Sequence, residues 1–281
     1  MLSEKLAVMP QYLMPKQLLT VLAGKLASKE AGATTTRAIR WFINRYQVNM
    51  SEALHQDPAH YRSFNEFFTR PLKDGARAIA DRRWICPVDG TISQCGPIDG
   101  EHIFQAKGHQ YTATTLLGDD AKLAEQFRDG TFATLYLSPR DYHRIHMPAK
   151  GTLKLMRYVP GALFSVNPLT ARQVPGLFAR NERVVCVFEG ETGPFVMVLV
   201  GATIVGSMAT VWHGVVNPPR PGKVIDWHYD EQNIVLDKGA EMGRFLLGST
   251  VVMLAPKGQW QLPDYWQNAR AIRLGEAMSA D

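Results

Sequence analysis

Residues 241–254 read Glu-Met-Gly-Arg-Phe-Leu-Leu-Gly-Ser-Thr-Val-Val-Met-Leu. Two apolar runs flank a Gly-Ser-Thr break, which predicts two strands joined by a sharp turn. Gly248 has no Cβ, so it can take backbone angles closed to other residues and leaves its carbonyl open to the hydroxyl of Ser249. Most turns of this kind are purely structural. This one also permits the chain to attack itself.

The sequence before this turn is typical of a β-rich domain. From about residue 79, short runs rich in Val, Ile, Thr and Phe alternate with Gly and Pro, as in sandwiches and barrels. We therefore expect an α+β protein in which residues 76–281 form a predominantly β sandwich or distorted barrel with few helices. The expected strands are residues 91–93, 131–137, 151–159, 183–189, 194–205 and 207–216.

Residues 1–75 are expected to be helical, with Thr36 and Ser63 as helix caps. Residues 1–45 carry seven of the 31 Lys and Arg but two of the 26 Asp and Glu, so the later residues carry 24 of each sign. Basic residues beside Trp, Phe and Leu suit a helix in the headgroup layer of an anionic membrane, although such an arm can also simply pack on the rest of the protein. The lack of a later basic excess argues against nucleic acid. The candidate membrane contacts are Lys16, Lys25, Arg37, Arg40, Trp41, Phe42 and Arg45.

The composition bounds the class of protein. The chain has 281 residues, of which 46% are hydrophobic, enough for a sizeable core. Three cysteines, Cys86, Cys95 and Cys186, show no metal-ligand spacing and indicate reduced thiols in a cytosolic setting. We expect no membrane-spanning segment, because no run of about eighteen apolar residues occurs. Glu4 and Lys5 also interrupt any run typical of a signal peptide.

The segment with the most chemistry is residues 137–148, Leu-Ser-Pro-Arg-Asp-Tyr-His-Arg-Ile-His-Met-Pro. His143 and His146 can take and give protons near neutral pH. A metal site is not favoured, because the segment offers no third ligand at a zinc spacing. Asp89 lies earlier in the chain, in a Pro-Val-Asp-Gly turn, and such a turn by itself is usually structural. Together Asp89, His146 and Ser249 nevertheless supply an acid, a base and a nucleophile.

The surroundings of Ser249 do not fit the commonest serine hydrolases. Their nucleophile has glycines two residues away on either side, whereas this chain has Leu247 and Val251. The most accessible carbonyl is instead that of Gly248.

Two further segments mix apolar and polar side chains, residues 107–111 and 161–167. They either line a pocket for an amphiphilic ligand or form loops over the core, and composition does not distinguish the two. The candidate substrate-binding residues are His109, Tyr111, Phe164 and Ser165.

Over nearly its whole length the chain resembles the pyruvoyl-dependent phosphatidylserine decarboxylases, in particular the bacterial membrane-associated type. The tetrapeptide Leu247-Gly-Ser-Thr matches the processing signature of that family. One departure is Val88, where the family often has Ala. The other matching segments are residues 64–72, 87–94, 138–148, 178–183 and 200–207.

The resemblance implies a reaction of the chain on itself. Asp89, His146 and Ser249 would act as a relay in which Ser249 attacks the carbonyl of Gly248, so that the precursor splits into residues 1–248 and 249–281. Ser249 would become a covalent pyruvoyl cofactor that forms a Schiff base with the amine of phosphatidylserine. Loss of carbon dioxide then gives phosphatidylethanolamine, with His143 as candidate proton donor or as the group that handles the carboxylate.

The resemblance also implies where the protein acts and what it contacts. The partners would be phosphatidylserine, an anionic membrane surface and the second product of its own cleavage, with further dimerisation left open. Residues 1–75 would then dock the β-rich catalytic domain on the cytoplasmic face of the cell membrane as a peripheral protein. Two alternatives are a membrane-lipid serine esterase that uses the same Asp89, His146 and Ser249, and a non-enzymatic β-domain adaptor held at membranes.

Overall fold

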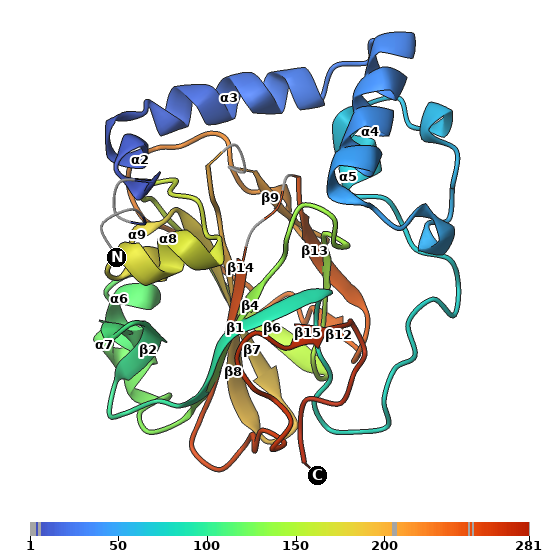
Figure 1. Cartoon of the computed structure of the whole chain (residues 1–281). Helices are drawn as coiled ribbons and strands as arrows, with labels where there is room; N and C mark the ends of the chain where they lie inside the picture. The colour runs from blue at the N-terminus through green and yellow to red at the C-terminus, as the bar shows by residue number, and fades with distance from the viewer. Residues whose placement is uncertain (1–3, 5–6, 204–206, 247, 249, 281) are drawn as a thin grey trace.

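The computed structural model describes residues 4, 7–203, 207–246, 248 and 250–280, and antiparallel strands dominate it from residue 90 onward (Figure 1). The architecture is α+β with mostly sheet, as the sequence predicted. Its larger sheet has nine strands, and every pair in it is antiparallel. In spatial order these are β11 (Ile225–His228), β6 (Gly151–Val159), β7 (Arg183–Gly190), β8 (Gly193–Val200), β14 (Thr250–Ala255), β4 (Thr131–Tyr136), β1 (Gly90–Pro97) and β15 (Ala271–Ile272), with β12 (Val235–Leu236) also paired to β6.

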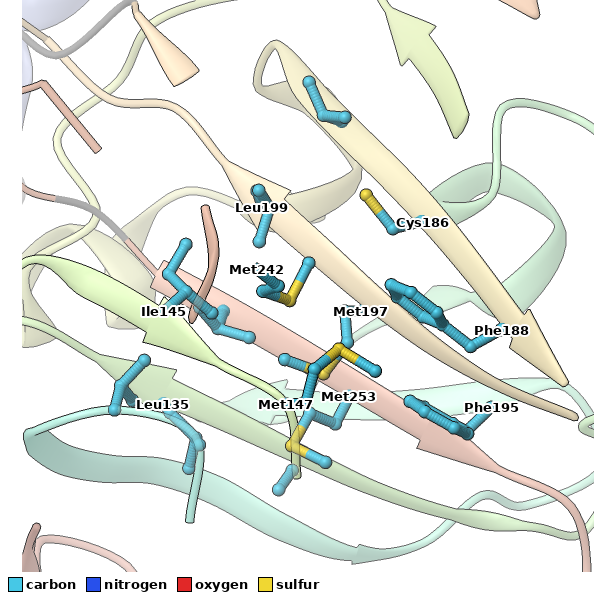
Figure 2. Packing of buried hydrophobic residues seen from close by; sticks show 14 of the residues in the cluster. Leu135, Ile145, Met147, Cys186, Phe188, Phe195, Met197, Leu199, Met242 and Met253 are labelled. Carbon is cyan, nitrogen blue, oxygen red and sulfur yellow. The ribbon is translucent and has the colours of Figure 1, made fainter. Parts of the chain in front are cut away.

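A second, four-stranded sheet packs on one face of the first. Alternate side chains of both sheets, among them Met197, Met253, Ile145 and Met242, meet in one buried cluster (Figure 2). The two layers form the predicted sandwich, because side chains that alternate along each strand place one apolar set between the sheets. In spatial order the smaller sheet consists of β10 (Gly214–Val215), β9 (Met208–Thr210), β13 (Glu241–Phe245) and β5 (Arg144–His146).

Short helices and a hairpin cover the other face of the nine-stranded sheet. The remaining side chains of the same strands, such as Val185, Val198 and Val252, pack there in a second buried cluster. Burial on both faces explains why β14 is a continuous apolar run without polar alternation. The covering elements are β2 (His102–Ala106), β3 (His109–Thr112), α6 (Ala113–Leu116), α7 (Ala121–Glu125), α8 (Pro168–Gln173) and α9 (Leu177–Arg180).

The chain crosses from one sheet to the other between β13 and β14, because β13 belongs to the smaller sheet and β14 to the larger. The amide of Phe245 donates to the carbonyl of His143 at 3.0 Å, and the amide of Leu246 donates to the carbonyl of Ser207 at 3.0 Å. The two predicted strands are confirmed, whereas the predicted turn between them lies partly outside the described residues. Gly248 lies where the chain passes between the layers.

The N-terminal helices lie beside one end of the sandwich, with α3 (Lys16–Ala27) extended across it (Figure 1). The helix α4 (Ala33–Tyr46) begins before Thr36, so the predicted cap at Thr36 was wrong. The cap at Ser63 is confirmed, since its hydroxyl accepts from the amide of Glu66 at 3.1 Å. The other elements of this region are α2 (Pro10–Leu13), η1 (Met50–Glu52), η2 (Pro58–His60) and α5 (Phe64–Phe68).

Two other expectations bear on the site. The single strand predicted over residues 207–216 is a hairpin of β9 and β10, and β8 ends at Val200 rather than near residue 205. In the part of the chain that the structure describes, no helix is long and apolar enough to cross a membrane.

Candidate functional site

Gly248 lies against the imidazole of His143. A Cβ built on Gly248 would be 2.8 Å from Nε2 of His143, closer than real Cβ atoms approach a neighbour. The expectation that Gly248 takes backbone angles closed to other residues stays a prediction, because its φ angle depends on residue 247, which lies outside the described residues. Glycine is required here for space.

His143 is fully buried and is held by its neighbours in a fixed orientation. Its Nδ1 donates to the carbonyl of Asp141 at 2.8 Å, and the ring of Phe68 covers it with 4.0 Å between centroids. Burial lowers the pKa of His143 to about 3, and the charge of Arg70 acts in the same direction. The ring is therefore neutral at pH 7, with its lone pair on Nε2. That nitrogen has no hydrogen-bond partner among the described residues.

His146 lies at the end of β5, with both ring nitrogens engaged. Nδ1 donates to the carbonyl of Gly239 at 2.7 Å, which leaves Nε2 to accept from the hydroxyl of Tyr142 at 3.0 Å. Burial lowers the pKa of His146, while the hydrogen bond to Gly239 and the charges of Glu241 and, less strongly, Asp89 act in the opposite direction. His146 is thus a neutral base whose accepting nitrogen is occupied by a hydroxyl.

Asp89 lies in the turn before β1 and is mostly buried. Its carboxylate accepts two hydrogen bonds from Arg77, at 2.9 and 2.5 Å, and one from the amide of Leu274 at 2.9 Å. Arg77 also donates to Glu52 at 2.8 Å. Asp89 and His146 share no hydrogen bond in the described structure, so Asp89 acts on His146 through its charge alone. Ser249, the third member of the predicted relay, lies outside the described residues.

A cleft of about 370 Å³ opens beside Gly248. Aromatic side chains from α4 and α5 form one wall, and the segment around Ser165 contributes another. No Lys or Arg lines it within the described part of the chain. The lining residues are Phe42, Tyr46, Phe64, Phe68, Tyr136, Leu137, Pro139, Ser165, Val166, Asn167, Ala202, Thr203 and Gly248.

Of the four predicted substrate-binding residues, Ser165 alone lines this cleft. Phe164 is buried against Tyr12, with 5.0 Å between ring centroids. His109 and Tyr111 lie on β3, where Tyr111 packs on Phe178 under the nine-stranded sheet. The structure therefore does not bring His109, Tyr111 and Phe164 to the cleft.

The predicted membrane contacts divide into two sets. Phe42 faces inward and packs on Phe64 with 5.1 Å between centroids, and Lys16 lies 4.3 Å from the ring centroid of Phe164. Their assignment as membrane contacts does not fit these positions. The exposed set consists of Lys25, Arg37, Arg40, Trp41 and Arg45.

A larger cavity of about 580 Å³ separates α3 from the sandwich. Val21 and Lys25 of α3 line one side, and Val215 and Leu246 line the other. The N-terminal arm therefore bridges this end of the sandwich and leaves a gap beneath it.

Sequence reasoning missed several residues of the site. Arg77 and Arg70 lie in irregular segments and carry no periodic signal, so no pattern connected them to Asp89 or His143. Tyr142 was within the motif of residues 137–148, and its spacing of four from His146 could have suggested the contact. Within the described residues, no group of three or more His, Cys, Asp or Glu side chains is arranged to hold a metal ion.

The comparisons with known proteins cover the whole chain. A family model described as phosphatidylserine decarboxylase matches residues 64–280, and one described as PSD matches residues 6–47. A phosphatidylserine decarboxylase proenzyme of Dechloromonas aromatica is 70% identical over 280 residues, covering 100% of this chain and 99% of that protein. Proteins of the same name from Azoarcus sp. and Albidiferax ferrireducens are 68% and 66% identical, covering 99% and 98% of this chain and 96% and 97% of their own.

Proposed function

The chain belongs to the phosphatidylserine decarboxylase family, whose members are self-processing, pyruvoyl-dependent enzymes that make phosphatidylethanolamine, and we propose that Gly248 and Ser249 form its processing site. The observation that carries the proposal is the position of Gly248. It lies between two sheets, against an unpartnered nitrogen of His143 and at an apolar cleft.

Ser249 is the nucleophile and the carbonyl carbon of Gly248 is its target. Attack by the hydroxyl converts the peptide bond to an ester, and elimination then separates residues 1–248 from residues 249–281. The smaller product contains β14, which pairs with β4 on one side and β8 on the other and is buried along its length. Removing that strand would expose the core, so the two products stay together as a heterodimer.

We assign His146 as the base that takes the proton of Ser249, with Asp89 stabilising the charged ring. Two observations support this assignment. The hydrogen bond to Gly239 fixes the tautomer that accepts at Nε2, and the charge of Asp89 favours protonation of His146. The hydroxyl of Tyr142 has to leave Nε2 before the serine proton can reach it.

The surroundings of Gly248 fit a pyruvoyl group at residue 249. Such a group supplies the electron sink that loss of carbon dioxide from an amino acid requires. His143 faces this junction and is the candidate proton donor at the substrate carbon. The apolar lining excludes water from the reacting atoms, while Ser165, Asn167 and Thr203 offer polar groups to a headgroup.

The N-terminal arm is proposed to dock the enzyme on an anionic membrane as a peripheral protein, on the cytoplasmic face of the cell membrane. Leu18, Leu22 and Leu26 form an exposed stripe along α3, at 58%, 49% and 72% exposure, with Lys25 and Lys29 beside them. Exposed leucines between lysines are suited to the headgroup boundary of a bilayer that contains anionic lipid.

The test is the intact mass of the purified wild-type chain and of Ser249→Ala. We expect wild type to give two fragments split between residues 248 and 249, and Ser249→Ala to give one inactive chain. An active wild-type protein that remains uncleaved contradicts the proposal.

The serine esterase alternative requires a free hydroxyl on Ser249. A fluorophosphonate that labels Ser249 in the active protein would support the esterase. Inactivation by borohydride in the presence of phosphatidylserine instead identifies a ketone as the reacting group.

A further inference from the structure

Self-cleavage creates a new charge at the site. When the ester between the hydroxyl of Ser249 and the carbonyl of Gly248 eliminates, the Cα of residue 249 loses a proton and its Cβ–O bond breaks. The oxygen leaves with the bonding electrons, so Gly248 ends in a carboxylate. The precursor has no carboxylate at this point. This inference rests on the proposed function, which does not say where the new carboxylate lies after cleavage.

The described surroundings offer this carboxylate a buried nitrogen that has no hydrogen-bond partner. The cleft beside Gly248 is lined in its described part by no Lys or Arg. Nε2 of His143 faces Gly248, and it is buried without a hydrogen-bond partner in the precursor geometry. Burying a carboxylate without a partner is costly, so the new chain end either leaves the cleft or binds this nitrogen.

We propose that the carboxylate formed on Gly248 by self-cleavage remains at His143 and forms an ion pair with its imidazolium. The backbone favours this outcome because β13 fixes residue 245 close to His143: the amide of Phe245 donates to the carbonyl of His143 at 3.0 Å. Three residues later the chain ends at Gly248. The new carboxylate is therefore tethered beside the imidazole.

The charged group that acts on His143 in the described precursor is Arg70, which disfavours protonation. The other contacts of the His143 ring, with the ring of Phe68 and the carbonyl of Asp141, are uncharged. A carboxylate about 4 Å away opposes the effect of burial, and at an effective dielectric constant of about 20 it raises the pKa of the imidazole by about three.

The ion pair changes what His143 can do. Before cleavage Nε2 of His143 takes up a proton only near pH 3, and after cleavage the same atom takes up a proton about three pH units higher, close to neutral pH. That proton is then available to the substrate carbon after carbon dioxide has left. Cleavage would thus convert a residue that cannot donate a proton at Nε2 into one that can, in the same event that forms the cofactor.

The test is an NMR titration of His143 in protein labelled with ¹³C-histidine, comparing cleaved wild type with uncleaved Ser249→Ala. We expect His143 to titrate below pH 4 in Ser249→Ala and between about pH 5 and 7 in the cleaved protein. The two titration midpoints should differ by about three pH units. His228, which is exposed on β11, is the internal reference signal in both proteins. Ser249→Gly is the second uncleaved form should Ser249→Ala fail to fold, and His143→Gln in cleaved or uncleaved protein assigns the signal.

The outcomes separate this inference from the proposed function. Intact mass is recorded on each NMR sample. An uncleaved, active wild-type chain overturns the proposed function and the ion pair with it. A cleaved chain in which His143 titrates as it does in Ser249→Ala overturns the ion pair alone.

Discussion

Nε2 of His143 and the backbone of Gly248 are so close that residue 248 has no room for a side chain, since a Cβ there would approach the nitrogen to 2.8 Å. The contact joins a histidine immediately before β5 to the residue that passes between the two sheets. The lack of space for a Cβ is by itself a reason for glycine at this position of the processing tetrapeptide. The contact also places the imidazole next to the bond that is proposed to break.

Gly248→Ala is expected to slow self-cleavage by about 100-fold, because the methyl group has to displace the ring of His143 or the backbone by some tenths of an ångström, and small misplacements of reacting groups are costly. Intact mass followed over time measures the rate. Gly24→Ala is the matched control, since a Cβ at Gly24 meets nothing within 4 Å. Wild-type cleavage by Gly248→Ala would show that the contact with His143 does not constrain the reaction.

Arg77→Gln, compared with Asp89→Asn, distinguishes a role of Asp89 in folding from its proposed role in the relay. The substitution removes both hydrogen bonds that the guanidinium donates to Asp89, as well as the one to Glu52, but keeps the charge of Asp89 and its contact with Leu274. We expect the free energy of unfolding to fall by about 3 kcal/mol, the cost of breaking a buried ion pair, while cleavage continues. Asp89→Asn should lose similar stability and should also slow cleavage by about 100-fold, because one of the two carboxylates that favour protonation of His146 is gone and the other, Glu241, remains.

Urea unfolding of both variants in the Ser249→Ala background gives the stability, and intact mass of the variants with Ser249 gives the cleavage rate. If Asp89→Asn cleaves as fast as Arg77→Gln, Asp89 serves folding alone and the relay assignment is wrong.

Acid should destabilise the uncleaved protein through its buried histidines. The folded state holds the pKa of His143 near 3 and that of His146 below its usual range, both mainly by burial. In the unfolded chain a histidine titrates near 6.5. Above that pH neither residue makes stability depend on pH. As the pH falls below 6.5, these histidines bind protons in the unfolded state but stay neutral in the folded state. The free energy of unfolding therefore falls by about 1.4 kcal/mol per pH unit for each histidine that stays neutral in the folded state.

Urea unfolding of Ser249→Ala at pH 7, 6 and 5 measures this dependence. Adding His143→Gln removes one of the two histidines, so the slope below pH 6.5 should become shallower by about 1.4 kcal/mol per pH unit. An unchanged slope in the double variant would show that His143 is protonated in the folded precursor.

The strands on either side of Gly248 could be predicted from sequence because the signal is local: two apolar runs interrupted by Gly, Ser and Thr. Their assignment to different sheets could not be predicted. It depends on pairing of β13 with β9 and β5, and of β14 with β8 and β4, all at long sequence separation. The hairpin at residues 207–216 was missed because its turn at residues 211–213 interrupts an apolar run that otherwise resembles one strand.

The same difference between local and long-range information applies to the residues of the site. His143, His146, Asp89 and Gly248 were found from residue type and motif. Which histidine faces Gly248 depends on the geometry of the segment leading into β5, and spacing of three residues does not decide it. Arg77 engages Asp89 from an irregular segment, where no periodicity marks it. His109 and Tyr111 lie away from the cleft beside Gly248, and sequence could not predict this because an apolar residue beside a polar one occurs equally in a hairpin over the core.

The exposed stripe on α3 makes the membrane proposal testable without touching the reaction. The triple variant Leu18→Gln, Leu22→Gln, Leu26→Gln removes most of the apolar surface that the stripe would bury in a bilayer. Since burying one leucine contributes about 1.5–3 kcal/mol, the partition onto vesicles containing phosphatidylserine should fall by at least about 100-fold in cosedimentation. The matched control is Leu54→Gln, Val211→Gln, Val235→Gln, whose side chains are exposed to a similar degree elsewhere. Both triple variants should still cleave fully by intact mass, because none of the six residues contacts Gly248 or lines its cleft. Equal loss of vesicle binding in both would mean that general surface hydrophobicity drives adsorption, and no loss in the α3 variant would show that another face of the protein meets the membrane.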